Sequence, residues 1–128
     1  MRYTGTGNSI GSSCSRCARI YGLLGLAAKK GSVISGSDAC EGALKKGIGS
    51  LLILAGDSSA NTKERFFRIV QKALPADKTV EYVIFGNCFE LGRRIGRGER
   101  SVMIVTDFGL SRGIFELLAL PPENNTGV

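Results

Sequence analysis

Two kinds of apolar pattern alternate along the chain. Continuous, mostly apolar runs are typical of strands covered on both faces, and they lie at 50–55, 80–85 and 101–106. The pair Val33-Ile34 predicts a further, minor strand. Apolar residues at helical spacing predict helices over 17–30, 38–46, 61–74, 87–96 and 110–118. This alternation predicts an α/β protein, a three-layer α/β/α sandwich with a small mixed sheet of about four strands.

Capping signals mark the shortest of these helices. Asn87 and Glu90 have the spacing of a capping box, so we expect the helix to begin at Asn87. Gly96 can supply the left-handed turn that ends it. The basic, glycine-containing segment 97–100 then leads into an apolar strand. Positive charge is thereby placed on a rigid edge, which suits a polyanionic partner. Similar helix-start signals lie at 35–38 and 61–64.

The chain is expected to form one domain. Residues 1–18 are rich in Gly and Ser at their start and are interpreted as a flexible N-terminal extension. Residues 19–120 form the predicted domain, and residues 121–128 form a polar tail. The glycines at 5, 7 and 11 follow no predicted strand, and no Gly-Lys-Ser/Thr sequence occurs, so they do not indicate a phosphate-binding loop.

Composition restricts the possible functions. Lys and Arg number 17 against 11 Asp and Glu, giving a net charge of +6, which favours a nucleic-acid partner. The chain has no histidine, which removes the commonest general base and the Ser-His-Asp schemes. No group of residues in the sequence has the types and spacing of a catalytic site, so we predict no catalytic residues and no enzymatic activity.

Other features bear on compartment and cofactors. The sequence has no apolar run of membrane-spanning length and no hydrophobic signal-peptide centre, so we expect a cytoplasmic protein with no membrane partner. Cys14 and Cys17 form a C-x-x-C pair that could be half a zinc site or a redox pair. No second pair and no histidine completes a site, whereas Cys40 and Cys88 lie among apolar neighbours. We therefore predict no metal and no cofactor.

The aromatic residues provide a further prediction. Phe66, Phe67, Phe85, Phe89 and Phe115 all lie in apolar patterns and are assigned to the core. With no exposed aromatic ladder, binding of single strands by base stacking is disfavoured.

An ordered set of short motifs resembles one protein family. These motifs are Gly25-Leu26-Ala27, Ser35-Gly36, Lys46-Gly47, 51–55 with Asp57, Leu91-Gly92 with Ile95-Gly96, and 102–107. They resemble the small bacterial YlxQ-type proteins of the ribosomal L-seven-A-e and L-thirty-e superfamily, from Leu23 to Leu118. The resemblance implies an α/β/α sandwich that binds kink-turn RNA.

The resemblance also implies where RNA is bound. Members of the family place the N-terminal end of one helix against RNA, and unpaired backbone N–H groups at the helix dipole's positive end favour phosphate there. Two loops add contacts. Carried over to this sequence, the implied RNA-binding residues are Gly36, Ser37, Asp38, Lys46, Ser59, Lys63, Arg97, Gly98 and Arg100.

Several positions depart from the family pattern. Strong kink-turn binders carry Asn-Glu and, one turn later, Lys, where this chain has Asp38, Ala39 and Gly42. Asp38 can accept a hydrogen bond from guanine but cannot donate one, and the other two residues offer no polar side chain. The second loop is apolar in many relatives and charged here. Arg97 and Arg100 could therefore add phosphate contacts, which strengthen binding without specifying sequence.

These observations predict a non-enzymatic RNA-binding protein that recognises structured, kink-turn-like RNA. The expected partner is rRNA or another kink-turn-containing RNA, with a ribosome- or translation-associated role implied by the resemblance alone, and we expect a monomer. Two alternatives stay open. One is a protein-interaction adaptor on the same fold that has lost specific RNA recognition, and the other is a substrate-recognition partner of an RNA-modifying enzyme.

Overall fold

The computed structural model describes residues 2–3, 15–72 and 80–119. Within this part of the chain, strands and helices follow one another in an almost regular alternation. In chain order they are β1 (Arg2–Tyr3), α1 (Ser15–Lys29), β2 (Val33–Ser35), α2 (Ser37–Lys45), β3 (Leu51–Leu54), α3 (Ala60–Lys72), β4 (Glu81–Ile84), α4 (Cys88–Arg94), β5 (Val102–Val105) and α5 (Phe108–Ala119).

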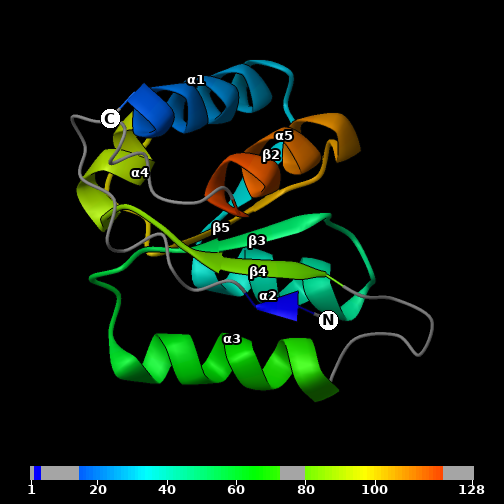
Figure 1. Ribbon diagram of the computed structural model, residues 1–128. Helices are drawn as coiled ribbons and strands as arrows, with labels where there is room; N and C mark the ends of the chain where they lie inside the picture. Colours follow the sequence, from blue (N-terminus) through cyan, green and yellow to red (C-terminus); the bar gives the residue numbers. More distant parts are fainter. Residues whose placement is uncertain (1, 4–14, 73–79, 120–128) are drawn as a thin grey trace.

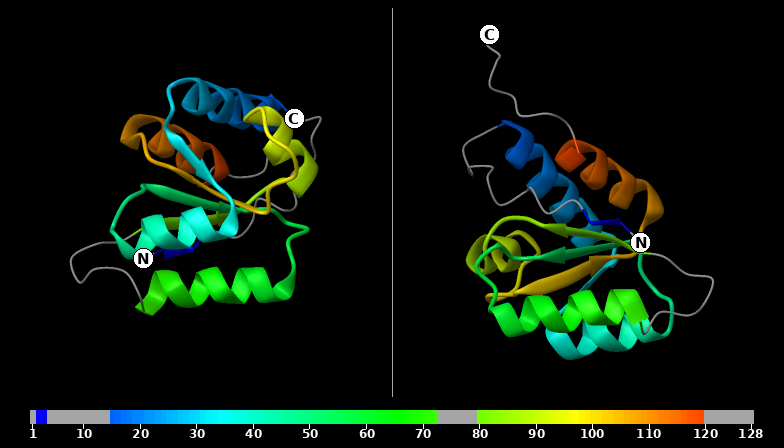
Figure 2. Two further views of the ribbon diagram at one scale, coloured as in Figure 1. Left: turned by 180° about the vertical axis from the view of Figure 1, so that it is seen from behind. Right: turned by 60° about the horizontal axis from the view of Figure 1, so that its bottom comes forward.

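The strands form one mixed sheet in the order β1-β4-β3-β5-β2. β4 pairs in parallel with β1 and β3, whereas β5 runs antiparallel to both of its neighbours, β3 and β2. Helices α1, α4 and α5 cover one face of the sheet, and α2 and α3 cover the other (Figures 1 and 2). The predicted three-layer α/β/α sandwich is confirmed.

The central strands are apolar on both sides because each side supports its own core. In β3, Leu51 and Ile53 pack toward α1 and α5, whereas Leu52 and Leu54 pack toward α2 and α3. Strand side chains alternate between faces, so a strand between two helical layers needs apolar residues at every position. All four residues of β3 and all four of β5 are buried, which explains the continuous apolar runs.

The N-terminal part of the chain differs from the sequence-based expectation. Helix α1 begins at Ser15, two residues before the predicted helix over 17–30, so the expected extension 1–18 overlaps the helix, and Cys17 is buried in the core. Arg2–Tyr3 also pairs with Glu81–Tyr82 as a short edge strand, so part of segment 1–18 joins the sheet. Two residues carry too little apolar pattern to predict a strand. Cys14, the end of the third predicted helix at 73–74 and the tail 121–128 lie outside the described residues.

The predicted boundaries of α4 are confirmed in detail. Asn87 is the N-cap, and its side chain accepts a hydrogen bond from the Glu90 N–H at 2.8 Å. Gly96, with φ of 76°, ends the helix. The Gly96 N–H bonds to Arg93 O and the Arg97 N–H to Gly92 O, the paired bonds of a Schellman motif. For α3 the true cap is Ser59, which accepts a hydrogen bond from the Thr62 N–H, so the helix begins before the predicted Asn61.

Two aromatic residues lie elsewhere than predicted. Phe66, Phe85 and Phe115 are buried, but Phe67 is 38% exposed and Phe89 is 59% exposed. In α4 the buried residues are Leu91 and Gly92. Positions two apart point to different sides of a helix, so burying Leu91 turns Phe89 outward. Among the described residues, no helix is long and apolar enough to cross a membrane.

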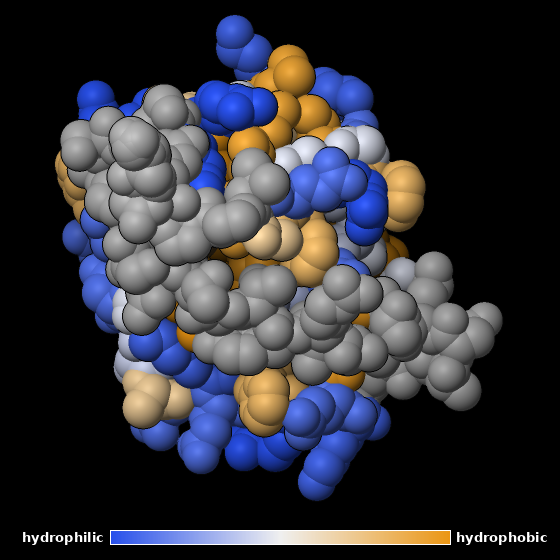
Figure 3. Space-filling model, viewed as in Figure 1, coloured by the Kyte–Doolittle hydropathy of each residue, from blue (hydrophilic) through white to orange (hydrophobic). Residues whose placement is uncertain are grey.

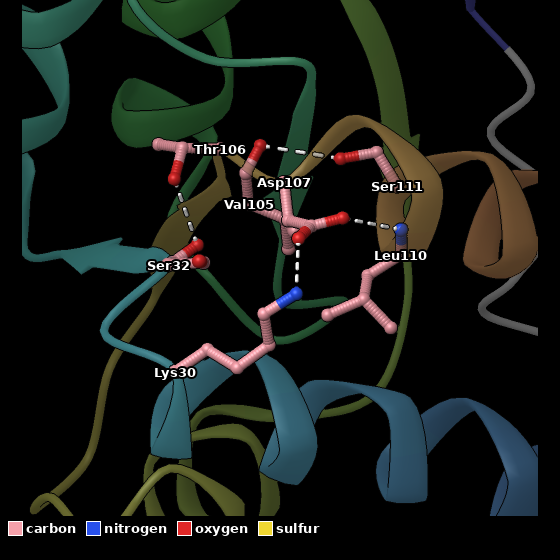
Figure 4. Close-up of polar contacts among 7 residues, drawn as sticks. All are labelled: Lys30, Ser32, Val105, Thr106, Asp107, Leu110 and Ser111. Atoms are coloured by element: carbon pink, nitrogen blue, oxygen red, sulfur yellow. Dashed lines mark hydrogen bonds and ion pairs between the residues drawn. The ribbon is translucent and has the colours of Figure 1, made fainter.

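A cluster of polar contacts fixes α5 to the sheet and to α1. The Asp107 carboxylate accepts hydrogen bonds from Lys30 Nζ at 2.6 Å and from the Leu110 N–H at 2.9 Å (Figure 4). The same side chain thus pairs with a cation and caps the start of α5. Ser111 Oγ donates to Val105 O, and Thr106 bonds to Ser32 O through its N–H and its hydroxyl. The Lys30 ammonium lowers the pKa of Asp107 below its ordinary value of 3.8.

We predict that Asp107→Asn lowers the urea midpoint of unfolding at neutral pH, because it keeps an oxygen that can cap α5 but loses the charge that pairs with Lys30. The folded-state pKa lies below the unfolded one. The stabilisation is therefore complete above the ordinary carboxyl pKa and disappears as the pH falls through the folded-state pKa. Urea unfolding across this acid range should show the difference between variant and wild type shrinking. Glu116→Gln, which removes the exposed pair with Arg112, is the control and should change little.

Candidate nucleic-acid interface

The topology brings four loops to one edge of the sheet. β2, β3 and β4 share a direction and β5 runs opposite, so the ends of the first three meet the start of the fourth. We call this region the carboxyl edge, and it comprises residues 35–39, 56–59, 86–87 and 96–101. It lies on the left in Figure 1, where α4 and the start of α3 are found. Backbone hydrogen bonds join the loops, among them Ala55 N to Ser101 O at 2.9 Å and Gly56 N to Gly86 O at 2.8 Å.

The N-terminus of α2 opens onto the carboxyl edge. Gly36 is its N-cap with φ of 97°, a conformation that favours glycine, and no side chain among the described residues caps the helix. The first intrahelical bond runs from Cys40 N to Gly36 O. The N–H groups of Ser37, Asp38 and Ala39 precede that bond, so they belong to the first turn, which is left without intrahelical acceptors. Together with the helix dipole they favour an anion at this position.

Arg100 lies directly beside this helix end. Its Nε donates to Ser35 Oγ at 3.2 Å, and its Nη1 donates to Glu99 O at 2.9 Å. The Arg100 N–H also bonds to Cys88 O at 3.1 Å, which ties the loop to α4. A guanidinium carries more N–H donors than these contacts use. Arg100 therefore places a fixed positive charge next to the residue that precedes the N-cap of α2.

The loop that carries Arg97 and Arg100 packs directly against the backbone of α4 at Gly92. A Cβ built on Gly92 would lie 1.8 Å from Gly98 O and 2.7 Å from Gly98 C. Only glycine at position 92 allows the loop to approach α4 so closely. Gly98 thus contributes its carbonyl to a structural contact, beside any contact with a ligand.

The loop between β3 and α3 is fixed by its own polar contacts. Ser59 serves as the N-cap of α3, and Lys63 Nζ donates to Gly56 O at 2.8 Å. Asp57 Oδ1 accepts from the Cys88 N–H at 2.9 Å, and hydrogen bonding from Cys88 lowers the pKa of Asp57. Lys63 is therefore a half-buried cation that this loop holds in place, whereas Ser59 and Asp57 stabilise helix ends.

Acidic side chains on α2 are paired with Arg65 of α3. Arg65 binds the Glu41 carboxylate through both Nε and Nη2, and its Nη2 lies 3.5 Å from Asp38 Oδ1. Hydrogen bonds from Arg65 and Lys45 lower the pKa of Glu41 to about 2. Arg65 therefore offsets negative charge that would otherwise oppose an anion near the start of α2.

The structure brings together all but one of the residues that the resemblance singled out. Gly36, Ser37 and Asp38 form the start of α2, Ser59 and Lys63 lie at the start of α3, and Arg97, Gly98 and Arg100 form the loop before β5. Lys46 lies apart from them. It is the C-cap of α2, a helix of 9 residues, and is about 13 Å along the axis from the other end.

The edge offers little for chemistry. Burial raises the pKa of the Cys88 thiol to about 11 and that of Cys40 to about 12, so neither is an activated nucleophile at neutral pH. Among residues 2–3, 15–72 and 80–119, no group of three or more His, Cys, Asp or Glu side chains could hold a metal ion. What the edge presents is an open helix N-terminus and anchored cations.

Sequence reasoning gave no role at this edge to four residues that shape it: Ser35, Asp57 and Gly92, which were noted as parts of family motifs, and Arg65. A glycine inside a short predicted helix was a usable signal for close approach, because Gly there costs helix stability. The partners of Ser35, Asp57 and Arg65 lie 65, 31 and 24 residues away along the chain, and no local pattern predicts such pairs.

Comparison with known proteins gives the family of this chain. The model of the ribosomal protein L7Ae/L30e/S12e/Gadd45 family matches residues 18–114. The chain belongs to this family.

Two relatives are similar over most of their length. RNA-binding protein YlxQ of Bacillus subtilis (strain 168) is 30% identical over 102 residues, which cover 77% of this chain and 93% of YlxQ. A protein of unknown function from Bacillus halodurans is 31% identical, with a TM-score of 0.73, over 80% of this chain and 99% of that one. Membership of a YlxQ-type branch of the family is therefore supported by sequence and fold together.

A more distant structure shares the fold alone. The Giardia lamblia 15.5kD RNA binding protein aligns with a TM-score of 0.63 at 18% identity, covering 90% of this chain and 94% of that one.

We predict that Gly92→Ala lowers the free energy of unfolding, because the added Cβ would displace the Gly98 carbonyl. The matched control is Gly22→Ala, inside α1, where a Cβ meets nothing within 4 Å. That substitution should stabilise the protein by about 0.5–1 kcal/mol, the usual effect of Gly to Ala in a helix. Urea denaturation of both variants measures the contrast, and equal stabilisation by the two would contradict the close contact.

Proposed function

We propose that this protein binds structured RNA of the kink-turn type through the carboxyl edge, without catalysing a reaction. The partner is rRNA or another kink-turn-containing RNA, and the role is cytoplasmic and linked to the ribosome or to translation. The protein acts as a monomer. Membership of the family and the name of the B. subtilis relative support an RNA partner.

One observation carries this proposal: the open N-terminus of α2 lies beside the anchored guanidinium of Arg100. RNA phosphates are acceptors with full negative charge, so they can use both the helix N–H groups and the guanidinium. A kinked RNA brings phosphates from separate strands close together, and a compact edge with several fixed donors suits that shape. Lys63 and Arg97 extend the positive surface on either side.

The proposed recognition depends more on shape than on bases. Asp38, Ala39 and Gly42 lie on α2 where relatives use side chains that contact bases, and each good bidentate base contact is worth about 1–3 kcal/mol of discrimination. Phosphate contacts by Arg97, Arg100 and Lys63 instead supply affinity that depends on salt. We therefore expect binding with moderate preference for the kinked element.

The direct test is a titration of labelled kink-turn RNA and of a control in which the sheared G·A pairs are replaced, each at two salt concentrations. The proposal predicts tighter binding to the kink-turn at both salt concentrations. Equal and steeply salt-dependent binding to the two RNAs would contradict specific recognition, and absence of binding to both would contradict an RNA-binding role.

We predict that Lys63→Ala weakens kink-turn binding and reduces the slope of log K against log salt by about 1, as expected for one lost phosphate contact. Lys72→Ala is the matched control, because Lys72 lies in the last turn of the same helix, away from the carboxyl edge. The control should leave both affinity and salt slope unchanged. Equal effects of the two variants would show that only overall charge matters.

A second candidate function is favoured by the same departures on α2. Ala39 and Gly42 offer no polar side chain, so the fold could serve as a protein-interaction adaptor on which specific RNA recognition has been lost. In that case the basic edge would bind RNA without preference.

The triple variant Asp38→Asn, Ala39→Glu, Gly42→Lys separates the two candidates. On the RNA-binding proposal it strengthens an existing preference for the kink-turn by roughly tenfold or more, because base contacts are added to an edge that already binds. If the wild-type protein shows no preference and the variant alone acquires one, the adaptor function is favoured. The same paired titration measures both.

A further inference from the structure

Phe89 presents an aromatic ring to solvent on the outer side of α4. It is 59% exposed, and the inner side of the helix is formed by Leu91 and Gly92. Another side faces α1, where the Arg94 guanidinium lies 4.7 Å from the Tyr21 ring and bonds to Glu90. Phe89 therefore belongs to neither packed side, and its ring contributes little to the core.

The ring is adjacent to the carboxyl edge. Its neighbour Cys88 donates its N–H to Asp57 and accepts from the Arg100 N–H, so the backbone at the start of α4 is bonded to two loops of the edge. Residues three apart lie on neighbouring sides of a helix. Phe89 thus borders the side on which Gly92 meets the loop that carries Arg97 and Arg100.

Cations accompany the ring along the same helix face. Arg93 follows Phe89 by four residues, so the two side chains share a face, and the Arg93 side chain is 63% exposed. Its Nη1 lies 3.8 Å from Glu90 Oε2, a long contact for an ion pair. Arg97, in the first residues after the helix, is also exposed. An apolar ring followed by guanidinium groups is complementary to a base followed by its phosphates.

We propose that Phe89 stacks an unpaired base in the strand that leaves the structured RNA element, while Arg93 and Arg97 bind the adjacent phosphates. The inference rests on the proposed function, because the structured element must occupy the carboxyl edge for its flank to reach α4. Base stacking tolerates any sequence, since every base has a π-face. The flank therefore adds affinity without adding sequence preference.

The charge around Phe89 favours RNA over a protein as the occupant. A protein partner that covered the ring with apolar side chains would also have to desolvate Arg93, which a phosphate can pair with directly. Figure 3 shows hydrophilic side chains gathered along the lower part of the molecule, over α3. The exposed ring of Phe89 beside the exposed guanidinium of Arg93 is therefore complementary to a partner that is both aromatic and anionic.

The test compares two kink-turn RNAs that differ only at the open end of the stem. One is blunt, and the other carries short unpaired adenosine overhangs with 2-aminopurine as a fluorescent base. We expect wild type to bind the overhang RNA more tightly and to change the 2-aminopurine fluorescence. Phe89→Ala should lose this advantage, weakening overhang binding by roughly 5- to 100-fold with little change on the blunt RNA.

Three further variants make the outcome specific. Phe89→Trp keeps an aromatic face and should retain the advantage, whereas Phe89→Leu keeps only apolar bulk and should lose it. Phe108→Ala is the matched control, because Phe108 is 71% exposed but lies at the start of α5, at the opposite edge of the sheet. It should behave as wild type.

The failures can be told apart. If wild type binds both RNAs equally, or if Phe89→Ala keeps the advantage, the stacking site is wrong and the proposed function stands. Retention of the advantage by Phe89→Leu would likewise exclude stacking. If wild type binds neither RNA, that result contradicts both the inference and the proposed function.

Discussion

The carbonyl of Gly98 packs against the Cα of Gly92, and the geometry of the carboxyl edge depends on that contact. A side chain at position 92 would collide with the backbone of Gly98, and relieving that collision would displace the whole loop. The same loop is bonded to α4 through the N–H of Arg97 and the N–H of Arg100. Its distance from α4 in turn sets where the Arg100 guanidinium meets Ser35, and hence how close a fixed cation lies to the start of α2. A contact between two glycines thus positions charge at a site that neither glycine forms by itself.

Four acidic residues near this edge have structural partners. Asp57 accepts from the start of α4, Glu90 bonds to Arg94, and Asp38 and Glu41 face Arg65. Exposed ion pairs of this kind contribute little to stability. Their larger effect is electrostatic, because they keep negative charge from opposing an anion at the N-terminus of α2. A basic composition becomes a locally positive edge through this pairing.

Sequence patterns predicted the layers of the fold because a strand that is buried on both faces has a continuous apolar sequence. The runs at 51–54 and 102–105 had to be apolar at every position, and the Asn87 capping box had to precede a helix. Arg2–Tyr3 shows no such pattern, since a strand of two residues at a sheet edge is too short to have a periodicity. Phe89 was misassigned to the core because a short helix offers too few turns to show which side is buried. The basic segment 97–100 was predicted from its sequence to suit a polyanion, but the rest of the candidate site was found through resemblance, because distant contacts such as that of Arg100 with Ser35 follow from topology.

The central claim is that RNA occupies the carboxyl edge. Amide chemical-shift mapping with unlabelled kink-turn RNA added to isotope-labelled protein tests it most directly. We predict that the perturbed amides cluster at 36–39, 56–59 and 97–100, while the groove between α1 and α5, lined by Leu23 and Leu117, is unaffected. Perturbations centred on that groove, with an unchanged carboxyl edge, would contradict the account.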